Sequence, residues 1–333
     1  MLLFAALPFF PARAAEQAVI DAAKKEGEVV WYTTQIVNQL AVPMAAAFKK
    51  KYGVEVKYIR ANTTEVTLRV MNEAKAGRVQ ADVIDGTSTT SALSKDGHIL
   101  AWLPDAVKRF PKDMYAADST WLATNIYILT PAFNTELVKT GTEPRTYDDL
   151  LKPQWKGKMV WGSSASSSAG PGFIGTVLKE MGPDKGRAYL DQLAKQQVTG
   201  LNVAARQVLD QVIAGEYVVA LQIFNNHAVI SAAKGAPSAW IPMEPATGLL
   251  SVASILKAAP HPNAAKLFLE FLISEEGQLL YKKADYMPAD PNVPPSDPGL
   301  LPASGKFRAQ FFTPEEIDAE MPQWLKLFQQ LFR

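Results

Sequence analysis

Two kinds of apolar spacing alternate along the first ninety residues of the chain. Residues 28–33 and 81–84 are short, mainly apolar runs with the length of buried strands, and residues 54–59 have the apolar–polar alternation of a strand. The segments before and between them have the three- to four-residue spacing of amphipathic helices: residues 16–26, residues 42–51, and a helix carrying Val66, Leu68, Val70 and Met71. This alternation of strand and helix predicts a parallel sheet covered by helices on both faces.

The same pattern continues after an apolar, β-rich crossover at residues 121–133. Strands are predicted at residues 158–161, 217–224 and 248–256, and helices near residues 172–179, 185–195 and 204–214. A single long amphipathic helix is predicted over residues 262–283, and a C-terminal helix packed on the outside over residues 312–332. The chain contains no internal repeat, and its 333 residues are enough for two α/β units of ordinary size.

Small polar residues follow each of the first three predicted strands. They can cap the next helix, which would explain any one cluster by itself. Three such clusters at the carboxyl edge of one parallel sheet also form the usual position of a ligand site in open α/β proteins. The candidate binding residues of this edge are Thr33, Thr34, Gln35, Asn62, Thr63, Thr64, Gly86, Thr87 and Ser88. Asp85 lies beside them, and its place before a Gly-Thr turn favours a capping role.

A serine-rich loop follows the strand at residues 158–161. Residues 163–171 contain five serines and no charged or bulky side chain. Such a loop offers hydroxyls and closely approaching backbone N–H groups at the end of a strand. Ser163 and Ser164 are therefore candidate ligand contacts, and the alternative is a flexible surface loop.

Composition narrows the function and the compartment. The 34 basic and 33 acidic residues give a net charge of +1 and form no basic block, so we expect no nucleic-acid partner. The chain has no cysteine, which excludes disulfides and cysteine nucleophiles. The apolar run at residues 2–10 and the Ala12-x-Ala14 pattern predict a signal peptide over residues 1–15, cleaved after about Ala14. Because a basic start is missing, we expect that the true start codon lies a few residues upstream.

The ordered motifs together resemble the periplasmic substrate-binding proteins of ABC importers, in their ferric-iron, phosphonate and thiamine branch. The resemblance rests on the segment TYDDLLKPQWKGKMVWGSSASSSAGPGF, on the Gly215-Glu216 step before a strand, and on HPNAAKLFLEFLISEEGQ. It implies the α/β, two-lobed type II binding-protein fold, each lobe a mainly parallel sheet flanked by helices. The implied lobes are residues 16–122 with 245–290 and residues 123–244, followed by a helical C-terminal tail at 291–333.

The resemblance also locates the residues that distinguish ligands. Iron-binding members carry a tyrosine pair after the strand that follows Gly-Glu, and this chain has Asn225, Asn226 and His227 there. Two amides and an imidazole are poor ligands for hard ferric ion but suit a carboxylate, phosphonate or hydroxyl group. Arg206, at the start of the preceding helix, is the candidate countercharge for an anion. The three histidines lack metal-ligand spacing, so no metal site and no cofactor are expected.

These observations predict a periplasmic, monomeric binding protein without enzymatic activity. It would capture a small organic anion, carboxylate before phosphonate, in the cleft between its lobes and deliver it to an ABC permease in the inner membrane. Ferric ion bound without tyrosines, or a binding subunit of a sensor system, are the alternatives. An enzyme on the same fold ranks last, because only the serine loop and His227 would supply a nucleophile and a base.

Overall fold

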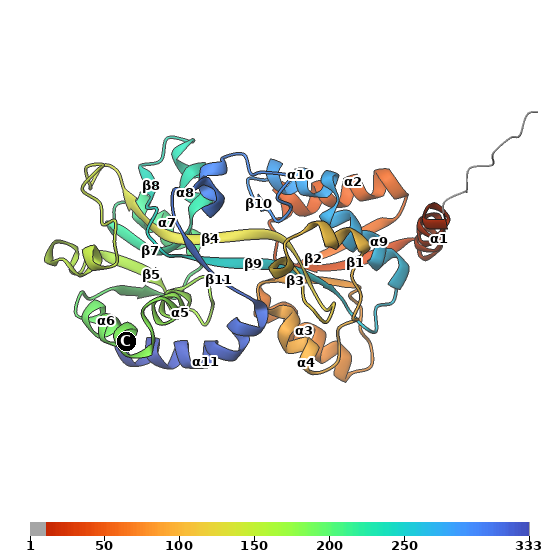
Figure 1. Ribbon diagram of the computed structural model, residues 1–333, viewed down its shortest axis with the longest axis horizontal. Coiled ribbons are helices and arrows are strands. Elements are labelled where there is room, and N and C mark those ends of the chain that lie inside the picture. The colour runs from red at the N-terminus through yellow and green to blue at the C-terminus, as the bar shows by residue number, and fades with distance from the viewer. Residues whose placement is uncertain (1–10, 333) are drawn as a thin grey trace, which may run out of the picture. The chain divides into compact units, whose positions relative to one another are not determined.

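The computed structural model describes residues 11–332, and side chains from Gln17 onward. The chain folds into two compact units (Figure 1). Unit 1 contains the residues up to Leu122 and Ala253–Leu280, and unit 2 contains Ala123–Val252 and the residues from Tyr281 onward. Residues 1–10, the larger part of the predicted signal peptide at residues 1–15, lie outside the described residues. No helix in residues 11–332 is long and apolar enough to cross a membrane.

Unit 1 is built on three parallel strands in the order β2-β1-β3. The sequence predicted these strands and the helices between them to within two residues, except that the first helix starts earlier. The elements are α1 (Pro11–Glu26), β1 (Glu28–Thr33), α2 (Val42–Tyr52), β2 (Glu55–Arg60), α3 (Thr63–Lys75), β3 (Val83–Gly86) and α4 (Thr89–Lys95). A five-residue π-helix at Val37–Ala41, which the sequence did not predict, leads directly into α2.

Strand β1 supplies side chains to cores on both faces of this sheet. Tyr32 packs with Val66 and Ile84 on the side of α3. Trp31 points the opposite way, as successive strand residues do, and its ring meets Phe268 edge-on at 5.3 Å. Phe268 lies on α9 (Pro262–Ile273), which therefore covers the second face. The α/β layering predicted for this part of the chain is confirmed.

The predicted single helix over residues 262–283 is wrong, because the structure divides it into α9 and α10 (Glu275–Lys283). Ser274 separates them with an extended backbone (φ −63°, ψ 160°). Its hydroxyl donates to the carbonyl of Phe271 at 2.7 Å and accepts from the N–H of Gly277 at 3.2 Å. One serine thus ends the first helix and begins the second, which apolar periodicity does not reveal.

Unit 2 contains a mixed sheet in the order β9-β4-β7-β5-β6, in which β4 runs antiparallel to β7. β8 and β10 also pair with β4, and β11 pairs with β9. The strands are β4 (Leu122–Asn134), β5 (Met159–Gly162), β6 (Thr199–Leu201), β7 (Val219–Phe224), β8 (Ser238–Trp240), β9 (Ala246–Ile255), β10 (Met287–Pro288) and β11 (Ala309–Phe312). The helices are α5 (Gly170–Met181), α6 (Pro183–Ala194), α7 (Ala205–Ile213), α8 (Asn225–Ala232) and α11 (Pro314–Leu331).

The C-terminal helix α11 packs against α5 (Figure 1). It starts with a capping box between Thr313 and Glu316. Trp324 and Phe328 are buried in the core of unit 2, so the helix completes that core rather than only covering its outside. Glycines of α5 allow this approach, since a Cβ on Gly175 would lie 2.4 Å from the Trp324 ring.

Candidate functional site

The ends of β1 and β3 are joined by the side chain of Asp85. Thr33 Oγ1 donates to Asp85 Oδ2 at 2.5 Å, and the Thr34 N–H and hydroxyl both donate to Asp85 Oδ1 at 2.7 Å. The three residues sit at the carboxyl edge of the unit 1 sheet, where the sequence predicted a polar cluster. Asp85 does not cap α4 with its carboxylate as expected, because both oxygens are engaged by β1 and the residue after it.

Asp85 is 1% exposed, and this burial raises the pKa of its carboxyl group. The hydrogen bonds from Thr33 and Thr34 act in the opposite direction and lower that pKa. The site therefore holds a buried carboxyl group whose two oxygens accept hydrogen bonds from the hydroxyls of Thr33 and Thr34. From the sequence, Thr33, Thr34 and Asp85 could be placed at the ends of two strands, but the hydrogen bonds between them could not be predicted.

Gly86, the next residue, has a backbone conformation that side chains rarely adopt (φ 151°). A Cβ there would lie 2.2 Å from Thr89 Oγ1 and 3.2 Å from Thr63 Oγ1. Glycine thus lets the turn after β3 approach the start of α3. Thr87 and Ser88 follow in this turn, half-buried, and their hydroxyls have no partner within residues 11–332.

The polar cluster after β2 is used mainly for helix capping. Asn62 Oδ1 accepts from the Glu65 N–H at 2.9 Å, while Glu65 Oε2 accepts from the Asn62 N–H at 3.0 Å. This capping box begins α3, and Asn62 is exposed. Thr63 is half-buried beside Gly86, and Thr64 is exposed. Gln35, after β1, is fully buried, and its N–H donates to Thr33 Oγ1 at 3.0 Å.

In unit 2, the serine loop connects β5 to the start of α5. Ser163 donates its N–H to the carbonyl of Leu201 at 2.8 Å, which fixes the loop to β6. The hydroxyls of Ser166 and Ser168 bond to one another at 2.9 Å. Those of Ser163 and Ser164 are half-buried and have no partner among the described residues. The loop therefore offers two open hydroxyls next to a strand end.

Three consecutive residues at the start of α8 carry buried polar atoms without a partner. Asn225 is fully buried and Asn226 is 6% exposed. Their Nδ2 atoms each donate at 2.8 Å to a backbone carbonyl, of Leu300 and of Asp285 respectively. In the described part of the chain, the Oδ1 atoms of both amides and His227 Nδ1 have no hydrogen-bond partner. The sequence predicted these residues through the family resemblance, but gave no sign of the two carbonyls that orient them.

His227 and Arg206 lie close enough to interact electrostatically. Burial lowers the pKa of His227 to about 4, with a further lowering contribution from the positive charge of Arg206. Arg206 donates to Asp210 Oδ1 at 2.7 Å and to Ser231 Oγ at 2.8 Å. The expected countercharge is therefore partly balanced by an ion pair within α7, although 44% of its side chain is exposed.

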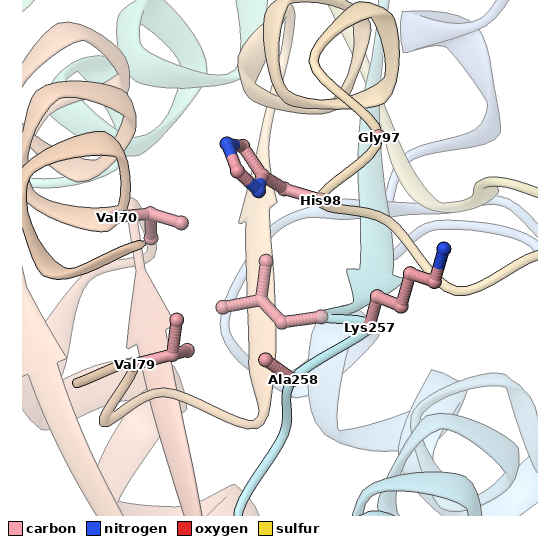
Figure 2. A pocket seen from close by; sticks show the side chains of 7 residues that line it. Val70, Val79, Gly97, His98, Lys257 and Ala258 are labelled. Carbon is pink, nitrogen blue, oxygen red and sulfur yellow. The ribbon is translucent and has the colours of Figure 1, made fainter. Parts of the chain in front are cut away.

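Two pockets lie away from the predicted site residues. One, of about 110 Å³, is lined in unit 1 by Val70, Val79, Gly97, His98, Leu256, Lys257 and Ala258 (Figure 2). The other, of about 270 Å³, is formed in unit 2 by the charged loop between Gly141 and Trp155. Residues 11–332 hold no cluster of three or more His, Cys, Asp or Glu side chains suited to a metal ion.

Residues 43–304 match the family of bacterial extracellular solute-binding proteins, and the chain belongs to that family. The resemblance predicted from the sequence motifs is thereby confirmed. An uncharacterized protein of Haemophilus influenzae is 28% identical over 292 residues, which are 82% of this chain and 80% of that protein.

Solved periplasmic binding proteins have the same fold. Iron-bound HitA from Pseudomonas aeruginosa superposes with a TM-score of 0.78 at 21% identity, covering 91% of this chain and 99% of its own. AfuA from Actinobacillus pleuropneumoniae, with exogenous fructose-6-phosphate bound, gives 0.77 at 23% identity, covering 92% and 98%. The predicted two-lobed α/β binding-protein fold is confirmed by these neighbours.

Proposed function

We propose that this protein is the solute-binding component of an ABC transporter and that it captures a small organic anion, carboxylate before phosphonate. Its two units act as the lobes of the binding protein, and an ABC permease in the inner membrane receives the solute. The protein works as a periplasmic monomer after cleavage of a signal peptide near Ala14. It binds without turnover, in keeping with a family of binding proteins.

The open hydroxyls carry the proposal for an anion. Thr87 and Ser88 in unit 1, and Ser163 and Ser164 in unit 2, are half-buried and have no partner in the described part of the chain. Hydroxyls are good donors to carboxylate and phosphonate oxygens, and bonds to a charged acceptor are the stronger kind. Arg206 is the proposed countercharge, because nearly half of its side chain remains exposed.

Ferric ion is the second candidate, because structural neighbours such as HitA carry iron. The residues at the start of α8 argue against it here. Asn225, Asn226 and His227 would offer amide and imidazole groups where ferric ion prefers anionic oxygens. A binding subunit of a sensor system would use the same site, and loss of solute uptake on deletion of the gene distinguishes transport from sensing.

A thermal-shift screen of the purified protein tests the proposal. Carboxylates, phosphonates, phosphate esters and ferric citrate are compared, and an anion at about 100 times its Kd adds roughly 2.7 kcal/mol of stability. Absence of a shift with every anion would overturn the proposal, and so would tight binding of iron alone.

Calorimetry then compares the native protein with the double variant Thr87→Ala/Ser163→Ala. This variant should lose a few kcal/mol of binding energy, since each charge-assisted bond contributes roughly 1.5–3 kcal/mol. The control is Thr140→Ala, at an exposed position whose hydroxyl has no hydrogen-bond partner among residues 11–332. Unchanged affinity in the first variant would show that these two hydroxyls do not hold the anion.

A further inference from the structure

We propose that unit 2 carries a second binding site, for a phosphate ester, in the cavity of about 270 Å³ between Gly141 and Trp155. All nine residues that line this cavity belong to unit 2, and none of them is among those proposed to hold the captured solute. The site is therefore additional to the proposed function and independent of it. Its chemistry follows from which hydrogen-bonding groups of the loop are occupied and which are open.

Both carboxylates that line the cavity are engaged by the loop itself. Glu143 Oε1 accepts from Nε and Nη2 of Arg145 at 3.0 and 2.9 Å, and its Oε2 accepts from the Gly141 N–H at 2.5 Å. Asp149 Oδ1 accepts from Lys152 at 2.6 Å, and its Oδ2 accepts from the Arg145 N–H at 2.9 Å. The hydrogen bonds from Lys152 and the Arg145 N–H lower the pKa of Asp149 to about 2, so this pairing persists at neutral pH. A cation that entered the cavity would find no unbonded carboxylate oxygen.

The basic side chains of the same cavity keep open donors. A guanidinium has five N–H groups, and Arg145 gives two of them to Glu143, so both hydrogens of Nη1 remain. Lys152 gives one of its three to Asp149. The two basic side chains are 65% and 58% exposed, so a ligand can reach these donors. Gln154 is exposed, and its amide forms no hydrogen bond in the described part of the chain. The cavity thus offers donors to a ligand that carries several acceptor oxygens.

A buried tryptophan also lines the cavity. Trp155 is 5% exposed, and its indole N–H has no acceptor among residues 11–332. A buried donor without a partner is unfavourable, and an oxygen atom of a ligand would satisfy it. Pro144, which is buried as well, adds apolar surface to the lining. Because a phosphate monoester brings three strong acceptor oxygens and a charge of about −1.5 to −2 at pH 7, it matches this set of donors better than a carboxylate does. Its organic part would lie against the apolar residues.

The chain segment around the cavity is basic. Residues 139–158 contain five basic and three acidic side chains, a net charge of +2. Lys139, Lys156 and Lys158 are exposed and form no ion pair with any described residue. Positive charge within a Debye length, about 8 Å at physiological ionic strength, attracts an anion to the cavity. A soluble phosphate ester and the headgroup of an anionic phospholipid have the same chemistry here, so the two sources are separated by experiment.

Two measurements on the native protein test the site. Glycerol 3-phosphate is titrated into the isotope-labelled protein, and we expect NMR shifts of the backbone signals of residues 141–155 and of the Trp155 indole. Flotation with phosphatidylglycerol vesicles, against phosphatidylcholine vesicles, tests the headgroup as the source. Absence of shifts in residues 141–155 together with absence of binding to phosphatidylglycerol would overturn the proposal. Shifts confined to Ser163 and the start of α8 would also overturn it, and would leave the proposed function standing.

Variants then assign the binding to the cavity. Arg145→Gln/Lys152→Gln removes both charged donors, and we expect a loss of affinity of about tenfold or more for whichever phosphate source binds. The matched control is Lys234→Gln/Lys326→Gln, which removes the same charge at two exposed, unpaired positions of unit 2 and should stay within about twofold of the native protein. Equal losses in the two variants, or none in the first, would contradict the assignment. If the first variant does not fold, Gln154→Glu, which places a negative charge at an exposed position of the lining, must weaken binding in the same way.

Discussion

Thr33 Oγ1 lies 2.5 Å from Asp85 Oδ2, and this bond joins the first and third strands of unit 1 where both end. The two residues are 52 positions apart in the chain, and both are almost completely buried. Thr33, which the sequence analysis predicts to be a ligand contact, thus has a structural role as the hydrogen-bond donor to a buried carboxyl group.

Replacement of Thr33 by valine should lower the free energy of unfolding by about 1–3 kcal/mol, because the shape is kept while a buried carboxyl group loses a hydrogen-bond donor. Chemical denaturation measures the change. Thr33→Ser retains the hydroxyl and should therefore retain most of the stability of the native protein. Thr140→Val, at an exposed position, is the control and should change stability by less than about 0.5 kcal/mol. A valine variant as stable as the native protein would show that Asp85 does not depend on this bond.

His227 should make stability depend on pH between about 4 and 6.5. Its pKa is lowered to about 4 from 6.5, so the unfolded chain takes up the proton first as the pH falls. The contribution of the neutral imidazole is complete above pH 6.5 and is lost as the pH falls through the folded pKa, by at most about 3 kcal/mol. Unfolding free energies measured across this range should rise with pH, and the slope should decrease in His227→Gln. An identical slope in the variant would refute the lowered pKa.

Gly86→Ala should lower the free energy of unfolding more than Gly97→Ala does. Both residues have a positive φ that L side chains rarely adopt, so each alanine is strained by about 1–3 kcal/mol. Only at Gly86 would the new Cβ also collide with Thr89, whereas nothing lies within 4 Å of a Cβ at Gly97. Thermal unfolding of the two variants measures the difference. Equal destabilisation would mean that the turn after β3 has room to move.

Trp324→Ala should lower the free energy of unfolding by about 3–5 kcal/mol, because it removes a large buried side chain that packs against Gly175 and Phe312. The neighbouring exposed Gln323→Ala provides the control and should be nearly neutral. Denaturant titration of both variants gives the comparison. A small effect of the tryptophan change would indicate that α11 contributes little to the core.

Most strands and helices could be predicted because their apolar periodicity is local. The sequence did not predict the strands β6, β8, β10 and β11 or the helices α4 and α8. Residues 28–33 form β1 as predicted, since a run of β-branched and aromatic residues ends there at a threonine. The break at Ser274 was missed because serine is compatible with either a continuous helix or two caps. Apolar periodicity indicates which face of an element is buried, but it does not indicate which groups a serine hydroxyl hydrogen-bonds.

The site was predicted only in part, for a related reason. Residue type and strand ends led to Thr33 and Thr34, and the family resemblance led to Asn225, but the direction of their hydrogen bonds depends on residues far away in the chain. Asp85 and the carbonyl of Leu300 supply that direction. A backbone carbonyl leaves no trace in residue identity, so the acceptor character of Asn225 could emerge only from the folded chain.

The position of α11 has a consequence for biogenesis. Ile317, Trp324 and Phe328 belong to the core of unit 2, so that core stays incomplete until the end of the chain has left the ribosome. Unit 1 in turn needs Phe268 from α9. A chain whose two cores are both completed by late segments stays unfolded through most of its synthesis. For a periplasmic protein, this delay in folding keeps the polypeptide unfolded, and so able to pass through the export machinery, when it reaches the membrane.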